Sequence, residues 1–286
     1  MKEKRTIFQS IKKDFYKGFK RLYWFTYTRL FYYFLSILFK VRKKKINNYK
    51  ISLICPSRER VLKFSRMVNS LFQKTYKIEN IEMLVLLDTN DKEIDLYKKE
   101  ITNMNNKGLD AKIFIIDLQN NAKRINYLVK RSKGDVFFSV NDDLIFKSNN
   151  WDYYTNFEFS KIDMNMPFCL WITSDVKYNY LHCEFPIINR SWYNILGYHS
   201  TEYFSHWNLD TWICDLSHRS KKFFVSNLIE VEQISANRFS DEIDNTHLVN
   251  IAKQKLNNDS EVWKETKKIR ITESLKLKNN LKSIVD

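Results

Sequence analysis

Glycine and proline are scarce in this sequence, which has 4 Gly and 3 Pro among its 286 residues. No glycine lies between residues 51 and 66, where the body of the protein begins, so a glycine-rich phosphate-binding loop is excluded there. The few glycines that remain mark positions where the backbone has a special requirement. With 44% hydrophobic and 15% aromatic residues, the chain is too apolar to be disordered and is long enough for one large domain with an appendage.

Cysteine is also sparse and follows no pattern. The four cysteines are Cys55, Cys169, Cys183 and Cys214, and no two of them have the short spacing of a zinc-binding motif. Two of them lie within apolar runs. The sequence therefore predicts buried, reduced thiols in a reducing compartment.

Excess basic charge is confined to one end of the chain. Residues 1–50 contain 15 Lys and Arg against 2 Asp and Glu, whereas the other 236 residues contain 33 and 31. The net charge of +15 therefore belongs to the amino-terminal segment, and the rest is close to neutral. This asymmetry indicates an anionic surface as the partner of the amino-terminal segment and argues against nucleic acid as a ligand of the body.

The amino-terminal segment combines its charge with a long aromatic run. Residues 22–39 read LYWFTYTRLFYYFLSILF, with basic residues on both sides. A narrow polar stripe recurs at steps of three and four residues: Thr26, Arg29, Tyr33, Ser36 and Lys40. This spacing predicts an amphipathic helix that lies in the headgroup region, so that residues 1–45 bind an anionic membrane surface from the cytoplasm. A single transmembrane helix over 22–39 and a helix packed on the body or on a second subunit are the alternatives.

Apolar runs and helical patterns alternate through the first half of the body. Strands are predicted at 51–55, 81–87, 111–117 and 135–140, with helical patterns between them. This rhythm predicts an α/β fold with a mainly parallel sheet flanked by helices. In the less regular second half, strands are predicted at 167–173, 223–226 and 228–231, and helices at 190–196, 206–218 and from 259 onward.

Charged residues follow three of the predicted strands. Arg58 and Arg60 come after the first strand, Asp88 after the second, and Asp142 and Asp143 after the fourth. Ligands of parallel sheets bind beyond the carboxyl ends of the strands, so these side chains are expected to meet. Each aspartate alone is also explained as a turn former or helix cap. Together with the arginines, they predict a site for a divalent cation and a diphosphate.

Three segments of the first half contain motifs in a recognisable order. They are ISLICPSRER (51–60), IEMLVLLDTND (81–91) and NAKRINYLVKRSKGDVFFSVNDD (121–143). They resemble the family 2-like glycosyltransferases of the GT-A fold, in which similar segments form the opening strand, the strand before the base-binding aspartate, and the strand that ends in an Asp-Asp metal motif. Gly134 falls where that family has its glycine.

Two later segments extend the resemblance over roughly residues 50–235. FPIINRSWYNILGYHS (185–200) is similar to the family's acceptor-side segment, and HWNLDTWICDL (206–216) to the helix with the catalytic base. The resemblance implies a GT-A, Rossmann-like mixed sheet. We divide the chain into a membrane-associating leader at 1–48, a GT-A domain at 49–250 and a charged helical extension at 251–286.

The resemblance and the strand-end positions together assign nucleotide binding to several residues. These are Pro56, Ser57, Arg58, Arg60, Asp88, Arg124 and Asp142. Asp88 is implied to bind the base and Asp142 the ribose, while Asp143 is implied to coordinate Mn²⁺ or Mg²⁺. Many members have a further histidine ligand after the final strand, but this chain has Gln233 in that place, which leaves the third metal ligand open.

The later segments imply an acceptor side. Asp210 is implied to be the general base, with Asp215 of the same predicted helix as the competing candidate. His206, Trp207 and Gly197 are assigned to the acceptor region. The aromatic residues around them suit sugar stacking, although core packing accounts for them as well.

Taken together, the residues predict a hexosyltransferase-like glycosyltransferase that depends on Mn²⁺ or Mg²⁺. The donor is expected to be a nucleotide-diphosphate sugar, with UDP-sugars favoured, and the acceptor a glycan or lipid-linked hydroxyl. Inversion at the anomeric carbon and a role in cell-surface polysaccharide synthesis are expected. A catalytically inactive nucleotide-sugar-binding module and a nucleotidyltransferase with a related fold are the alternatives.

Overall fold

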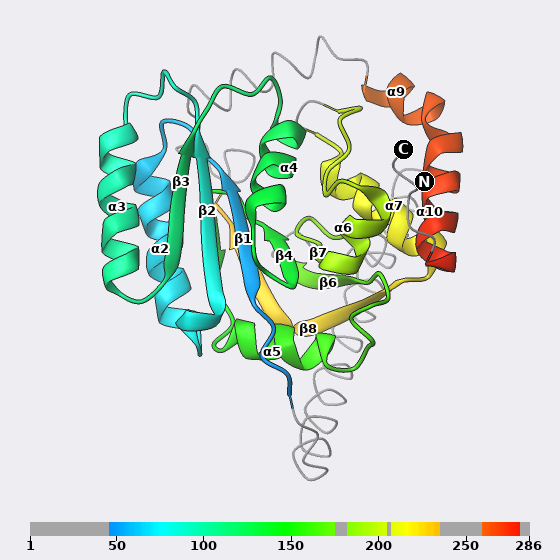
Figure 1. Ribbon diagram of the computed structural model, residues 1–286, viewed down its shortest axis with the longest axis horizontal. Helices are drawn as coiled ribbons and strands as arrows, with labels where there is room; N and C mark the ends of the chain where they lie inside the picture. The colour runs from blue at the N-terminus through cyan, green and yellow to red at the C-terminus, as the bar shows by residue number, and fades with distance from the viewer. Residues whose placement is uncertain (1–45, 175–181, 205–206, 235–258, 281–286) are drawn as a thin grey trace, which may run out of the picture. The chain divides into compact units, whose positions relative to one another are not determined.

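The computed structural model describes residues 46–174, 182–204, 207–234 and 259–280 (Figure 1). The helix expected at 22–39 lies outside these residues, as does His206. Within the described ranges, no helix has both the length and the hydropathy that a membrane crossing requires. The compact body begins at Ile46.

An eight-stranded mixed sheet runs through the body in the order β3-β2-β1-β4-β7-β6-β8-β5 (Figure 1). The strands are β1 (Ile51–Pro56), β2 (Ile81–Leu87), β3 (Asp110–Ile115), β4 (Val136–Ser139), β5 (Leu144–Phe146), β6 (Cys169–Ser174), β7 (Ile187–Asn189) and β8 (Phe223–Gln233).

The strand directions bring most of the carboxyl ends to one edge of the sheet. Strand β1 is parallel to β2 and β4, and β2 is parallel to β3. Because β7 is antiparallel to both β4 and β6, β6 runs in the same direction as β4, and β8 is parallel to β6. The strands β1, β2, β3, β4, β6 and β8 therefore end at the same edge, which we call the carboxyl edge.

Helices cover both faces of this sheet. They are α2 (Val61–Lys74), α3 (Ile94–Asn106), α4 (Asn121–Arg131), α5 (Trp151–Phe159), α6 (Arg190–Leu196), α7 (Leu209–Ser220), α9 (Asp259–Glu265) and α10 (Lys267–Asn279), with a short 3₁₀ helix at Ile78–Asn80. Right-handed crossovers place α2 and α3 on one face and α4, which returns from β3 to β4, on the other (Figure 1). The carboxy-terminal α10 packs against α6 and α7.

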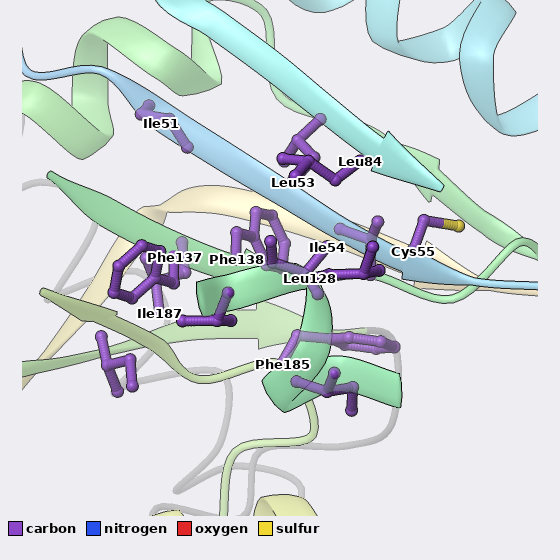
Figure 2. Packing of buried hydrophobic residues seen from close by; sticks show 14 of the residues in the cluster. Ile51, Leu53, Ile54, Cys55, Leu84, Leu128, Phe137, Phe138, Phe185 and Ile187 are labelled. Atoms are coloured by element: carbon purple, nitrogen blue, oxygen red, sulfur yellow. The ribbon is translucent and has the colours of Figure 1, made fainter. Parts of the chain in front are cut away.

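The core consists of apolar side chains from the central strands and the helices above them. Strand β2 is buried along its whole length, as expected of a strand covered on both faces. Figure 2 shows Leu53, Leu84, Phe137 and Leu128 in one cluster, contributed by β1, β2, β4 and α4. All four cysteines are buried and free, as the sequence predicts.

The patterns in the sequence predict the long strands and helices of the structure but not the short ones. The four strands predicted in the first half are present as β1 to β4. Strands β5 and β7 have three residues each, which is too short for a periodic pattern. Helix α5 was missed because it buries polar as well as apolar residues and has no clear polar face.

The region predicted as two strands, 223–226 and 228–231, is the single strand β8. Its pairing with β6 is interrupted: Ile172 lies opposite Ser226, but the next residue, Thr173, lies opposite Glu230. Residues 227–229 are therefore additional residues in β8, in the manner of a β-bulge. Beyond the bulge, β8 continues to the carboxyl edge and pairs there with β5.

Candidate functional site

The site predicted from the sequence lies at the carboxyl edge. The pairing registers keep the ends of β1, β2, β3 and β4 level with one another. The residues that follow these strands therefore emerge side by side, and they include Arg58, Asp88, Asp117 and Asp142. This is the edge at which ligands of parallel sheets bind.

Asp88 is a buried carboxylate held between two arginines. Its side chain is 6% exposed, and its Oδ2 lies 3.3 Å from Nη1 of Arg58. Its Oδ1 accepts a hydrogen bond from Nη2 of Arg124, which is delivered by the first turns of α4. Arg58 is the more exposed of the two arginines, at 39%, so its guanidinium is accessible from solvent.

Asp142 is connected to the loop after β1. The hydroxyl of Ser57 donates to its Oδ2 at 2.6 Å, and Nη1 of Arg60 donates to its Oδ1 at 3.1 Å. The Tyr97 hydroxyl from α3 lies 2.6 Å from the Ser57 hydroxyl and accepts the backbone N–H of Arg60 at 3.2 Å. Burial and the charge of Asp142 raise the pKa of Tyr97, so its hydroxyl stays protonated. This network fixes the loop after β1 against the end of β4.

Asp143 lies between Asp142 and the end of β8. Nε2 of Gln233 donates to its Oδ1 at 3.2 Å, and its backbone carbonyl accepts the N–H of Ile234 at 3.0 Å. Burial, followed by the neighbouring Asp142, raises the pKa of Asp143 to about 6. Burial and the same two carboxylates also raise the pKa of Cys55 beneath them. The pair is therefore a region of concentrated negative charge.

The residues present fit a hard divalent cation. No group of three or more His, Cys, Asp and Glu in the described ranges forms a complete metal site by itself. The carboxylate of Asp143 is nevertheless a hard oxygen donor with Asp142 adjacent, and the amide of Gln233 offers its oxygen after a half-turn about its last side-chain bond. Mg²⁺ and similar ions bind through one or two carboxylates and take their other ligands from water and substrate phosphates. Burial first, and then repulsion from Asp142, raise the pKa of Asp143, and a bound cation opposes both effects.

Two further acidic residues near Asp88 differ in role. Asp91 braces the loops, because its Oδ2 accepts the N–H of Glu59 and its Oδ1 that of Glu93, both at 2.8 Å. Asp117, which sequence reasoning overlooked, accepts the N–H of Thr89 at 2.8 Å and also the Thr89 hydroxyl. These hydrogen bonds lower the pKa of Asp117, with smaller contributions from the arginines that hold Asp88. The sequence could have identified Asp117 by its position, because it follows β3 much as Asp88 follows β2.

The two residues predicted as candidate bases have different surroundings. Asp210 lies in the first turn of α7, and its Oδ2 is 3.0 Å from Nε2 of His182, a residue that sequence reasoning did not select. Asp215, the competing candidate, is bound by Nε of Arg219 at 2.7 Å and Nε of Arg270 at 2.9 Å. Because Arg270 belongs to α10, Asp215 connects α7 to that helix.

Two other residues predicted for the acceptor region lie around the ends of α6 and α7. Gly197 ends α6 with a φ of 81°, a left-handed conformation that favours glycine. Trp207 is in the turn that precedes α7. Pro56, assigned to the nucleotide pocket, is the last residue of β1.

Three solved structures of glycosyltransferases are similar to this chain. Mannosyltransferase PcManGT from Pyrobaculum calidifontis, in complex with GDP-Man and Mn²⁺, matches with a TM-score of 0.54 and 12% identity over 71% of this chain and 64% of its own. S. aureus TarS in complex with UDP-GlcNAc matches with a TM-score of 0.50 and 14% identity over 68% of this chain and 62% of its own. GalNAc-T7 with UDP, GalNAc and Mn²⁺ matches with a TM-score of 0.53 and 14% identity over 65% of this chain and 43% of its own.

The protein thus has the GT-A fold, an α/β architecture built on a Rossmann-like mixed sheet, as the resemblance implied. The match spans less than two thirds of the length of each of these three proteins. No protein-family model and no curated protein matches the sequence. At this level of identity the similarity establishes the fold.

Proposed function

We propose that the protein is a glycosyltransferase that moves a sugar from a nucleotide-diphosphate sugar to an acceptor hydroxyl. The observation that carries the proposal is the convergence of a diarginine-bound carboxylate, Asp88, and a charged acidic pair, Asp142 and Asp143, at one edge of a GT-A sheet. The similar structures support it, because PcManGT is in complex with GDP-Man and TarS with UDP-GlcNAc.

Donor binding is assigned to the loops after β1, β2 and β4. Asp88 accepts from the nucleotide base, within a pocket lined by Pro56, Ser57 and Arg58. The guanidinium groups of Arg58 and Arg124 complement the diphosphate, and Arg60 holds Asp142 in place for the ribose. A UDP-sugar is favoured as the donor.

Metal binding is assigned to Asp143, with Gln233 as the neighbouring oxygen donor and Mn²⁺ or Mg²⁺ as the ion. When bound, such an ion supplies Lewis-acid neutralisation of the charge that develops on the leaving diphosphate. Both PcManGT and GalNAc-T7 are in complex with Mn²⁺. Arg58 and Arg124 provide further positive charge close to the same leaving group.

Acceptor activation is assigned to the amino end of α7, where Asp210 lies. A single base that removes the acceptor proton, without a covalent intermediate, gives direct displacement with inversion at the anomeric carbon. Gly197 and Trp207, together with His206, belong to the acceptor region. The acceptor is a glycan or a lipid-linked hydroxyl in cell-surface polysaccharide synthesis, and residues 1–45 hold the protein to an anionic membrane surface from the cytoplasmic side.

A second candidate function is nucleotide-sugar binding without transfer. It is favoured by one observation, which is that Asp143 is next to the amide of Gln233 where related enzymes have a histidine. In this structure the amide turns its nitrogen toward Asp143, and in that orientation it offers no ligand to an ion there. Release of nucleoside diphosphate from a bound donor distinguishes the two functions.

The test is calorimetric titration and thermal unfolding with UDP-glucose, UDP-N-acetylglucosamine and GDP-mannose, each with and without Mn²⁺. We expect one donor to raise the unfolding temperature only when Mn²⁺ is present, because a ligand that binds the folded state stabilises it. Asp143→Asn should weaken that donor's binding at least tenfold. Asp95→Asn, at an exposed position of α3, is the matched control.

Two outcomes decide the proposal. If none of the three donors binds with or without Mn²⁺, the assignment as a nucleotide-sugar enzyme is wrong. If a donor binds but no nucleoside diphosphate is released over hours, the protein is the binding module.

A further inference from the structure

A histidine and an aspartate from distant parts of the chain form a pair on the acceptor side. Nε2 of His182 lies 3.0 Å from Oδ2 of Asp210, and the two side chains are 30% and 32% exposed. They are accessible to a ligand while remaining fixed to each other. The assignment of Asp210 as the base takes no account of this partner.

We infer that His182 is the group that takes the proton from the acceptor hydroxyl, and that Asp210 is the positioning residue that orients its ring. This inference rests on the proposed function and deepens it. Because Nε2 contacts Asp210, the other ring nitrogen, Nδ1, is the one that takes the proton from the acceptor hydroxyl. A carboxylate that already accepts an N–H is a weaker base than a free carboxylate, whereas an imidazole held in this way has its tautomer fixed and its cation stabilised.

The position of the pair relative to the donor site follows from the sheet. Ser174 ends β6 at the carboxyl edge, and its hydroxyl donates to Oε2 of Glu184 at 2.8 Å. Ser174 lies opposite Val231, which is two residues before Gln233 in β8. With strand spacings of about 4.8 Å and a rise of about 3.3 Å per residue, Ser174 is about 8 Å from the residue that contacts Asp143.

The segment that contains His182 is also fixed to α7. The N–H of Cys183 donates to Sγ of Cys214 at 3.2 Å, and the Cys214 thiol donates to the Cys183 carbonyl at 3.3 Å. This reciprocal pair of hydrogen bonds joins the loop to the helix that presents Asp210. The loop that contains His182 is therefore joined to β6 through Glu184 and to α7 through Cys183. This places the His182–Asp210 pair on the same edge of the sheet as the acidic pair.

The titratable groups around the ring favour its protonated form. The hydrogen bond to Asp210 raises the pKa of His182 above its ordinary value of about 6.5, partial burial opposes this, and the charge of Glu184 adds to it. Burial raises the pKa of both neighbouring thiols, that of Cys183 to about 12, so they are neutral and add no charge. The neutral imidazole is the base, so its reaction rate rises with pH through this raised pKa.

The step balances as a single displacement. The acceptor oxygen forms a bond to the anomeric carbon of the donor sugar while the bond from that carbon to the diphosphate oxygen breaks. The electron pair of the broken bond leaves with the nucleoside diphosphate. The acceptor proton moves to Nδ1 of His182 and is later lost to solvent.

The experiment uses the full chain with Mn²⁺ and the donors UDP-glucose, UDP-N-acetylglucosamine and GDP-mannose, with water as the acceptor. Release of nucleoside diphosphate is measured from pH 4.5 to 9 for the wild type, His182→Gln, Asp210→Asn and the control His218→Gln. His218 is an exposed residue near the end of α7 and has no part in the site. Donor affinity is measured in parallel, and the histidine ring signals are titrated by NMR.

We expect His182→Gln to lower kcat by a factor of about 10² to 10⁴ while the donor Kd changes less than twofold. The acid limb of the wild-type rate should lie above pH 6.5. Asp210→Asn should move both that limb and the NMR titration of His182 to lower pH. Imidazole added to His182→Ala should restore part of the lost rate, which a merely structural role would not allow.

Two results overturn the inference and leave the proposed function intact. One is a His182→Gln enzyme that binds donor and turns it over at the wild-type kcat. The other is a wild-type acid limb near pH 4, which identifies a carboxylate as the base. If the wild type binds none of the donors, the proposed function fails and this inference fails with it.

Discussion

At the scale of single residues, His199 shows how burial sets the acid stability of this protein. The ring is 1% exposed, its Nδ1 lies 3.0 Å from the Ser200 hydroxyl, and its Nε2 has no hydrogen-bond partner among the described residues. Asn126 of α4 holds the local backbone by accepting the N–H groups of residues 199 and 200 at 2.9 Å. Burial lowers the pKa of His199 to about 4.

This pKa leads to a prediction about stability. Between pH 6.5 and pH 4 the unfolded chain protonates this histidine while the folded protein does not, so the free energy of unfolding falls as the pH falls. Between pH 7.5 and pH 5.0 the loss amounts to about 2 kcal/mol, since pH 5.0 lies about 1.5 units below the ordinary pKa and each unit corresponds to about 1.4 kcal/mol. Urea unfolding at pH 7.5 and pH 5.0 measures it.

The variant His199→Gln should have a smaller difference in free energy of unfolding between pH 7.5 and pH 5.0 than the wild type, because glutamine does not titrate. His218→Gln is the matched control and should keep the wild-type difference. An unchanged difference in His199→Gln would show that other groups cause the acid sensitivity.

At the scale of elements, the connection from α4 to β4 is fixed at the amino end of the sheet by Gly134. Its N–H donates to the Ser52 hydroxyl and to Oε1 of Glu82, both at 2.9 Å. Glu82 is 1% exposed and also accepts the N–H of Lys133. A Cβ at Gly134 would lie 2.1 Å from Oγ and 2.8 Å from N of Ser52. Only glycine lets β4 start this close to β1.

Gly134→Ala is therefore expected to destabilise the protein by about 2–4 kcal/mol, because backbone as well as a side chain must move. Gly197→Ala provides the comparison, since an added Cβ meets nothing within 4 Å there and only the positive φ is strained. That strain costs about 1 kcal/mol. Chemical denaturation of both variants tests the order, and equal losses would contradict the packing explanation.

Arg270 attaches the last helix to the body. Its side chain is 3% exposed, its Nε donates to Oδ2 of Asp215 at 2.9 Å, and its Nη1 donates to the Trp263 carbonyl at 2.7 Å. The guanidinium also lies 3.7 Å from the centre of the Trp263 ring. A planar donor group meets all of these partners at once, which an ammonium group does not.

Arg270→Ala should cost about 3–5 kcal/mol, as removal of one member of a buried ion pair does. Arg219→Ala removes the other, more exposed partner of Asp215 and should cost at most about 1 kcal/mol. Hydrogen exchange of α9 and α10 should increase in the first variant only. If exchange increases equally in both, the charge of Asp215 rather than the buried guanidinium determines the attachment.

At the scale of the whole molecule, the separation of charge between residues 1–50 and the rest predicts the partner of the leader. Each basic residue near an anionic leaflet contributes about 1 kcal/mol. A Lys43→Glu, Lys44→Glu, Lys45→Glu variant should therefore bind phosphatidylserine-containing vesicles at least 100-fold more weakly in cosedimentation. Binding by the wild type should also weaken when salt is raised from 50 to 300 mM.

The control makes the same change of charge at exposed positions of the body. Lys98→Glu, Lys99→Glu, Lys107→Glu alters α3 and the residue after it, and it should keep most of the vesicle binding. Equal loss in both variants would show that net charge alone governs binding. Equal binding of neutral phosphatidylcholine vesicles would contradict the electrostatic explanation.

The grouping of charged residues at the carboxyl edge was predictable from the sequence because these residues follow strands that have strong apolar patterns. Asp88 and Asp142 are found in this way, and the resemblance adds Arg124. His182 was not predictable, since it lies in an irregular stretch 28 positions before Asp210 and no spacing rule relates the two. The role of Asp215 was equally hidden, because its partner Arg270 comes from a helix 55 residues further along the chain.

The three additional residues in β8 bear on how the length of this strand can change in evolution. The strand is aligned with β6 on both sides of residues 227–229, and its far end is aligned independently with β5. Changes of length at residues 227 and 228 are therefore expected to leave the amide of Gln233 beside Asp143, provided that the buried side chain of Ile229 is kept. The sheet can therefore change in length at this point while Asp143 and Gln233 keep their positions relative to each other.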